Sequence, residues 1–234
     1  VTANNNWWGT ANLPLITAKI SGAVTYLPYY IDEAMTTLSN VAPAAVYVDD
    51  SFVFPDCGTH ICGYDAFTTV EEGVAAVATG GTVNVADGSY YPPAVVTLDK
   101  ALSIVGPAAG EAIIYGIGGA TVKVFDITSS NVTITGLTIT LANPPLANNI
   151  GMIHAPDGAK TNITITNNTI YVDPQAGTMS TWWGQAVNLG RFITASNVSD
   201  NTIYNTRGGI IVGYSSALTI SNNVIYNTKG GIMN

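Results

Sequence analysis

Asn201–Ile210 reads NTIYNTRGGI, and Asn223–Ile232 repeats it as NVIYNTKGGI, 22 residues later (from residue 201 to residue 223). A period between about 20 and 50 residues is typical of a solenoid. One turn of this length can hold three short strands joined by polar corners, which predicts a parallel β-helix. An immunoglobulin-like sandwich also contains many short strands, but it does not require near-identical repeats.

Short β-rich segments recur from Thr82 onward between Gly, Asn, Asp and Pro turns. In one of them, Val132 and Ile134 are predicted to face inward and Thr133 and Thr135 outward, so that stacked aliphatic side chains fill a narrow core. Asparagines at the corners are expected to stack between successive turns, where their amides pair with one another.

Residues 67–78 are predicted to form a helix. Thr68 and Glu71 fit a capping box, and Gly80 and Gly81 end the helix. Its apolar face consists of Phe67, Val70, Val74 and Val77. We expect this helix to cap the first turn of the solenoid, because that turn exposes apolar side chains and unpaired strand edges.

Three stretches, Tyr47–Asp50, Tyr64–Val70 and Gly80–Tyr90, resemble the opening of secreted right-handed parallel β-helix proteins. That group includes archaeal and bacterial cell-surface proteins with pectate-lyase-like repeats. Asn5–Gly9 (NNWWG) and Val24–Pro28 are similar to the coil that closes such solenoids. The resemblance implies a right-handed parallel β-helix, but it implies no single function, because this architecture serves lyases, hydrolases, adhesins and fibres.

The chain is therefore expected to have three parts. Residues 1–30 are a displaced closing coil, residues 31–66 are a linker with the Cys57–Cys62 loop, and residues 67–234 are the cap helix and the β-helix. The C-terminal end stops within a repeat. We expect residues 1–30 of one subunit to complete that end of the next subunit by β-augmentation. Such a head-to-tail contact generates a filament when its rotation does not close.

The expected subunit junction has a donating and a receiving side. Its residues are Asn5, Asn6, Trp7, Trp8, Val24, Tyr26 and Tyr29 on the donating side, and Ile225, Tyr226, Ile232 and Met233 on the receiving side. Asn6 matches Asn223, and 17 residues separate them if Val1 follows Asn234 (11 to Asn234 and 6 more). The same contact arises if the unit belongs to one covalent tandem array.

The composition excludes some functions. The net charge is -8 with only seven Lys and Arg, which argues against nucleic-acid binding, because that needs clustered cations. No apolar run approaches the roughly 18–20 residues that span a bilayer. The chain begins at Val1 without Met, which fits a removed signal peptide. We therefore expect an extracellular or cell-surface protein.

Cys57 and Cys62 lie five residues apart. In a secreted chain this spacing predicts a small disulfide loop. The alternatives are two free buried thiols or a metal site, for which further ligands are hard to find in the sequence.

Polysaccharide-cleaving β-helices need clustered carboxylates, either to hold calcium or to act as paired acid and base. From residue 121 to the end the acids fall singly and at unequal spacing, at Asp126, Asp157, Asp173 and Asp200. We therefore expect no enzyme activity and no obligatory cofactor. The alternative function is a polysaccharide lyase, a glycoside hydrolase or a carbohydrate-binding module. His154, in a predicted loop with Asp157, is interpreted as structural.

Three weaker sites complete the prediction. Asp49, Asp50 and Asp56 could bind calcium, or they could be solvated turn residues in an acidic protein. Trp182 and Trp183 are candidates for stacking on sugar rings. Sequons that fit N-glycosylation, or arise by chance in a chain rich in Asn and Thr, begin at Asn131, Asn162, Asn167 and Asn197.

Overall fold

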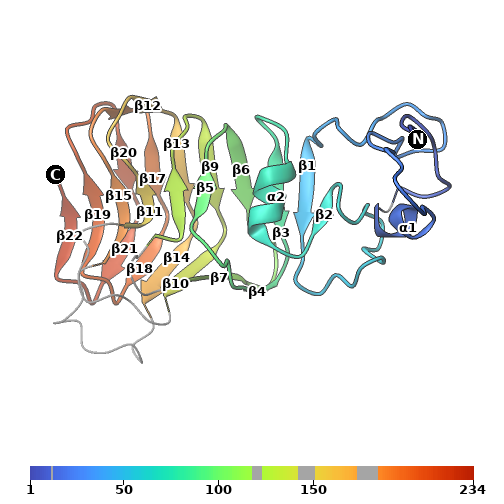
Figure 1. Ribbon diagram of the computed structural model, residues 1–234. Coiled ribbons are helices and arrows are strands. Elements are labelled where there is room, and N and C mark those ends of the chain that lie inside the picture. Colours follow the sequence, from blue (N-terminus) through green and yellow to red (C-terminus); the bar gives the residue numbers. More distant parts are fainter. Residues whose placement is uncertain (12, 118–122, 142–150, 173–183) are drawn as a thin grey trace.

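The computed structural model describes residues 1–11, 13–117, 123–141, 151–172 and 184–234. Their strands pair in parallel and wind into an elongated solenoid (Figure 1), which confirms the predicted all-β parallel β-helix. The N-terminus and the C-terminus lie at opposite ends of its long axis.

Three sheets run along the solenoid, and successive turns add a strand to each. Sheet 1 has the order β2 (Ala66–Phe67), β1 (Ala45–Val48), β3 (Thr82–Val85), β6 (Leu102–Val105), β9 (Val132–Thr135), β13 (Ile163–Thr166), β17 (Asn197–Ser199) and β20 (Thr219–Ser221). Sheet 2 has the order β4 (Gly88–Tyr90), β7 (Ala112–Gly116), β10 (Thr138–Leu141), β14 (Thr169–Val172), β18 (Thr202–Tyr204) and β21 (Val224–Tyr226).

Sheet 3 has the order β5 (Val96–Leu98), β8 (Phe125–Ile127), β11 (Gly151–Ala155), β15 (Gln185–Leu189), β19 (Gly208–Val212) and β22 (Gly230–Met233). A short fourth pair joins β12 (Lys160–Thr161) to β16 (Ile193–Thr194). Each sheet ends at β20, β21 or β22, so the last turn carries three strand edges that pair on one side only.

The inward residues of the three sheets form one continuous core. In β9, Val132 and Ile134 are fully buried, and the threonines that follow them lie at the outer face, as the alternation predicts. Aligned aliphatic and aromatic side chains stack along the solenoid axis from turn to turn. In sheet 3 one such fully buried column consists of Phe125, Ile153, Val187 and Ile210.

Asparagine side chains form a ladder inside the corner between sheets 1 and 2. Oδ1 of Asn201 accepts hydrogen bonds from the backbone N–H and from Nδ2 of Asn168, both at 3.0 Å. Oδ1 of Asn223 accepts from the same two groups of Asn201, at 3.1 and 2.9 Å. Nδ2 of Asn201 also donates to Ile165 O in the preceding turn. The predicted amide pairing is confirmed, and we call these three residues the asparagine ladder.

The residue before each ladder asparagine has a left-handed backbone. Its φ is 55° at Asn167, 59° at Asp200 and 56° at Asn222. Asn and Asp adopt this conformation more readily than other residues that carry a Cβ. The turn therefore needs an Asn or Asp followed by an Asn, which explains why this pair recurs in the repeats.

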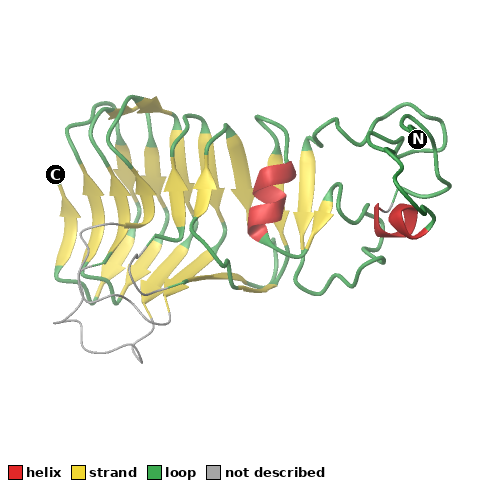
Figure 2. Cartoon of the chain, viewed as in Figure 1, coloured by secondary structure: helices red, strands yellow, loops and turns green. Residues whose placement is uncertain are grey.

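A cap helix covers the first turn, but its start differs from the prediction. Helix α2 spans Val70–Ala76 and packs against β1, β2, β3 and β5 (Figure 2). Thr69, not Thr68, is the N-cap: its Oγ1 accepts from the Glu72 N–H, and its hydroxyl donates to the Glu72 carboxylate at 2.9 Å. Phe67 belongs to β2, because its backbone is held by pairing with Val48.

The solenoid also begins earlier than expected. β1 and β2 lie within the predicted linker, and β1 pairs with β3 over its whole length. The loop between them contains the predicted disulfide, Cys57–Cys62, and both cysteines are buried. Residues 45–67 therefore belong to the folded end of the solenoid and do not act as a linker.

Glu71 gives a pH-dependent prediction. Its two carboxylate oxygens are buried without a hydrogen-bond partner on another described residue, and burial raises the pKa of the carboxyl above its usual value. Because the neutral form is favoured in the folded state, stability is greatest below the usual pKa and falls as pH rises through the raised one. We expect Glu71→Gln to raise the Tm at pH 7 by about 2–4 °C, roughly 1 kcal/mol after allowance for solvent screening.

The Glu71→Gln comparison is made by thermal unfolding at pH 7 and pH 4. The difference from the wild type should disappear at pH 4, where the carboxyl is already neutral. Glu33→Gln, at an exposed position, serves as the control and should leave the Tm unchanged at both values. An equal gain for Glu71→Gln at pH 4 would show that the buried charge is not the cause.

Candidate assembly interface

The last turn exposes side chains that earlier turns bury. Ile232 continues the buried column of sheet 3, and it is 55% exposed, whereas Ile210 in the turn below is fully buried. Val224, Tyr226 and Met233 are exposed as well. Tyr226 continues a stack of outward tyrosine rings, with its centroid 5.1 Å from that of Tyr204. All the predicted receiving residues therefore lie on this end turn.

The asparagine ladder also ends at this turn. Asn223 donates from Nδ2 to Val198 O at 2.8 Å in the turn below and to Ser221 O in its own turn. In the lower rungs, the Oδ1 of the next asparagine accepts from the backbone N–H and Nδ2. Among the described residues no asparagine follows Asn223 in the ladder. The end turn thus offers a defined polar position beside its apolar centre.

The N-terminal segment pairs with itself as two turns of a β-helix do. Thr2 and Thr25 form a parallel bridge, with Ala3 N to Thr25 O at 2.7 Å and Thr25 N to Val1 O at 2.8 Å. The bridge joins residues 23 apart, close to the 22 residues between Asn197 and Thr219 in paired strands of the last turns. Residues 1–30 therefore contain one turn of solenoid-like length.

Asn5 and Asn6 repeat the corner of the asparagine ladder. The φ of Asn5 is 53°, and that of Asn222 is 56°. Nδ2 of Asn6 donates to the carbonyl two residues earlier, Asn4 O, at 3.2 Å, as Nδ2 of Asn223 does to Ser221 O at 3.1 Å. The local structure supports the match of Asn6 with Asn223 that the sequence predicts.

The two tryptophans follow this corner and are half-buried. The indole Nε1 of Trp8 is buried without a hydrogen-bond partner among the described residues, and Trp8 O accepts from Lys19 Nζ at 2.7 Å. Helix α1 (Leu13–Ala18), which the sequence analysis missed, packs within the same N-terminal unit and buries Ile16. Buried indole N–H groups usually find a partner, so Trp8 is unusual.

One predicted donating residue is not available for contact. Tyr29 is 3% exposed, and its hydroxyl donates to Ala11 O at 3.0 Å inside the N-terminal unit. The prediction for Tyr29 is wrong because its ring fills the small core of this unit. Val24 and Tyr26 remain partly exposed, and the Tyr26 hydroxyl bonds to Thr17 Oγ1.

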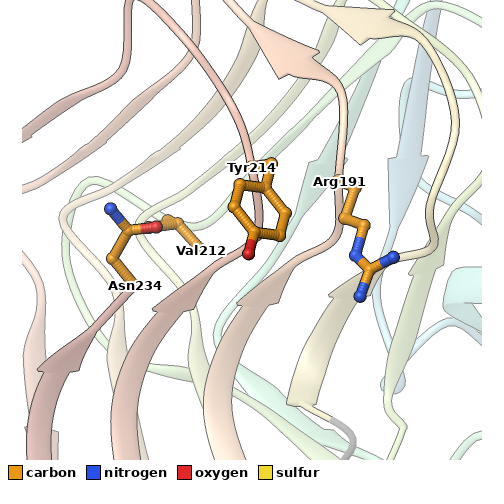
Figure 3. Close-up of a pocket in the computed structure, with 5 residues that line it drawn as sticks. Arg191, Val212, Tyr214 and Asn234 are labelled. Atoms are coloured by element: carbon orange, nitrogen blue, oxygen red, sulfur yellow. The ribbon is translucent and has the colours of Figure 1, made fainter.

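A shallow hollow of about 360 Å³ lies beside the last turn (Figure 3). Tyr214, 79% exposed, stands between Arg191 and Asn234, and the Arg191 guanidinium lies 5.6 Å from the centre of its ring. Phe192 is exposed nearby. These corner residues were missed, because single residues in variable corners carry no periodic signal.

The predicted calcium ligands do not come together. Asp49 accepts from Ser51, Asp50 from the Ser89 N–H, and Asp56 from the Gly58 N–H, so each carboxylate caps a separate turn. Within the described ranges, no group of three or more His, Cys, Asp or Glu side chains could hold a metal ion.

Structure separates the sequons into two kinds. Asn131, Asn162 and Asn167 are exposed at corners, whereas Asn197 is half-buried within β17 and its Nδ2 bonds to Ser199 Oγ. The first three are accessible to glycosylation, and Asn197 is not. The predicted sugar-stacking pair, Trp182 and Trp183, lies outside the described residues.

A polar cluster on sheet 3 bears on the enzyme alternative. His154 lies in β11, not in a loop, and its Nδ1 is 2.7 Å from Asp126 Oδ1, while Lys123 Nζ is 2.8 Å from Asp126 Oδ2. Burial raises the pKa of Asp126, but hydrogen bonds from His154 and Lys123 outweigh it and lower that pKa overall. The cluster holds one ionised carboxylate, whereas glycoside hydrolysis usually needs two.

No family model, curated protein or solved structure matches the chain. No described helix is long and apolar enough to cross a membrane. The geometry of the two ends of the molecule is therefore the main guide to function.

Proposed function

We propose that the protein is a structural, self-assembling unit in which the N-terminal segment of one copy completes the last turn of the next. The observation that carries this proposal is the match between the Asn5–Asn6 corner and the Asn222–Asn223 corner. The two complementary surfaces lie at opposite ends of an elongated molecule (Figure 1), so repeated docking extends along its axis.

The asparagine ladder defines the docked register. Asn6 Oδ1 would accept from the Asn223 N–H and Nδ2, as Asn223 Oδ1 does from Asn201. Asn6 Nδ2 would donate to Ile220 O, three residues before Asn223, as Asn201 Nδ2 does to the carbonyl three residues before Asn168. The new rung would thus repeat the contacts of the rungs below it.

The backbone supports the same register. With Asn6 over Asn223, Thr2 lies over Thr219, the residue whose N–H donates to Ser196 O in the turn below. In parallel strands, alternate residues bond to opposite neighbours. Because Val1 O and Ala3 N bond to Thr25, the N–H and C=O of Thr2 point the other way, toward the position that β20 would occupy.

This register places Trp8 over Ile225, an inward residue of the last turn. The indole would then cover the apolar end of the core, where Ile220, Ile225 and Ile232 are incompletely buried. An aromatic ring removes about 150–250 Å² from water when buried, which is the main attractive contribution expected at the junction.

The two copies need not be separate chains, but a direct peptide bond from Asn234 to Val1 does not fit this register. Asn234 would follow the position of Leu98, and Val1 would take that of Leu102, so one residue step would span a corner that takes four steps from Leu98 to Leu102. One step reaches only about 3.8 Å. A separate chain or an intervening segment is required.

The disulfide supports an extracellular location, since such bonds persist in oxidising compartments. Glycans on Asn131, Asn162 and Asn167 would keep a surface poor in charged residues soluble. These attributes belong to the proposal.

Cysteine trapping tests the junction directly. Thr2→Cys with Thr219→Cys places two thiols on exposed residues that become neighbours in the docked register, within the 4.4–6.8 Å Cα separation of disulfides. Mild oxidation should give a reducible ladder of multimers on denaturing gels, and electron micrographs should show filaments. Thr2→Cys with Thr97→Cys, an exposed site at the other end, is the control. Monomer only, or equal ladders from both pairs, would refute the proposal.

A further inference from the structure

A second hollow lies on the outer face of sheet 1, near the N-terminal end of the solenoid. Its volume is about 510 Å³, within the 300–1,000 Å³ of typical ligand pockets. Tyr47, Asn84 and Val105 are register neighbours on β1, β3 and β6 and form its floor. One wall is the turn of Gly106, Pro107 and Ala108, and the opposite wall belongs to the disulfide loop.

The disulfide loop holds two rings in place around the hollow. The His60 ring stacks on Tyr47 with centroids 3.8 Å apart, and Phe52 packs against the buried cysteines. The Ile61 N–H donates to Asp65 Oδ1 at 2.6 Å, which ties the loop to the strand that follows. The hollow is therefore formed before any ligand arrives, which lowers the entropic cost of binding.

The lining determines the class of ligand. Aromatic and aliphatic surfaces from Tyr47, Phe52 and Val105 suit a ring with an apolar face, and the amide of Asn84 and the carboxylate of Asp49 suit hydroxyl groups. Lys and Arg are absent from the described residues that line the hollow, so nothing there would neutralise a phosphate, a sulfate or a uronic acid.

We propose that this hollow binds a neutral pyranose ring, either as a small glycoside or as the terminal unit of a longer glycan. The hydroxyl groups at the rim and the apolar face of one sugar ring match the mixed lining. The site lies on the body of the solenoid and uses no residue of the proposed junction, so it stands apart from the assembly proposal. It gives the unit a means to attach to carbohydrate along its length.

Binding is measured on the full chain by saturation-transfer NMR and by titration with methyl glycosides of neutral hexoses, N-acetylhexosamines and galacturonate. The neutral sugars should bind, with dissociation constants on the order of 1 mM, and galacturonate should not. Neutral oligosaccharides ending in the same sugar distinguish the two sources: tighter binding than the methyl glycoside indicates a longer glycan, and equal binding a single ring.

A matched pair of variants locates the binding. Ala108→Trp fills the mouth of the hollow at an exposed position and should weaken binding at least tenfold, whereas Ala109→Trp, the next exposed residue, should not. His60→Ala should weaken binding to a similar extent. No saturation transfer from any neutral sugar, or binding that both Ala108→Trp and His60→Ala leave unchanged, overturns the proposal. Ile232→Asp, which should block assembly, should bind sugar as the wild type does.

Discussion

Asn201→Ala is expected to destabilise the solenoid by about 3–5 kcal/mol. The Asn201 side chain is 1% exposed, and its loss leaves the N–H and Nδ2 of Asn168 and the carbonyl of Ile165 without their partner. A buried polar group left unpaired costs about 1–3 kcal/mol. Because whole domains are stable by only about 5–15 kcal/mol, this one change removes a large share.

Urea unfolding measures the effect as a lower midpoint with an unchanged slope. Asn227→Gly is the matched control, since Asn227 also pairs with an asparagine of the neighbouring turn, Asn205, but at the exposed surface. Glycine retains the left-handed backbone of Asn227, so the control should lose no more than about 1 kcal/mol. Equal midpoints for the two variants would show that the asparagine ladder is not a main source of stability.

Trp8→Ala is expected to abolish head-to-tail association at micromolar protein. Truncation of a buried Trp costs about 3–5 kcal/mol, which corresponds to a dissociation constant raised about 100- to 1,000-fold or more. Trp7→Ala is the matched comparison, because Trp7 falls over Val224, an outward residue, and should change the constant less than about tenfold. Analytical ultracentrifugation of both variants measures the constants.

Trp8 also packs within its own unit, so a change on the receiving side is needed as well. Ile232→Asp alters an exposed residue and should leave the Tm unchanged while blocking association. Val53→Asp introduces the same charge at another exposed aliphatic position and should not affect association. Normal association of Ile232→Asp would exclude the last turn as the docking surface.

Most of the fold was predictable because it is local and periodic. A 22-residue repeat, alternation as in Val132–Thr135 and paired Asn residues at the corners each act on residues that are close in sequence or one turn apart. The helix start was misplaced by two to three residues, since Phe67 fits both the helical face and a strand that pairs with Val48. Pairing across the first turn, which local propensity does not contain, decided between them.

The functional residues were predictable only in part. The match of Asn6 with Asn223 is visible in the sequence because both belong to a repeated motif. The burial of Tyr29 and the pairing of Asp126 with His154 join residues whose separation, 28 in the second case, follows no simple repeat. The hollow beneath the disulfide loop likewise joins Tyr47, His60 and Val105 from different elements.

The sequence by itself determined the solenoid, its turn length, its asparagine corners and its disulfide loop, because stacking repeats one set of local interactions along an axis. Only the tertiary structure decided which side chains the end turns leave uncovered and which surfaces lie opposite one another. Ile210 and Ile232 occupy the same place in the repeat, yet one is buried and the other exposed. Their difference arises from the turn that follows, and burial depends on neighbours.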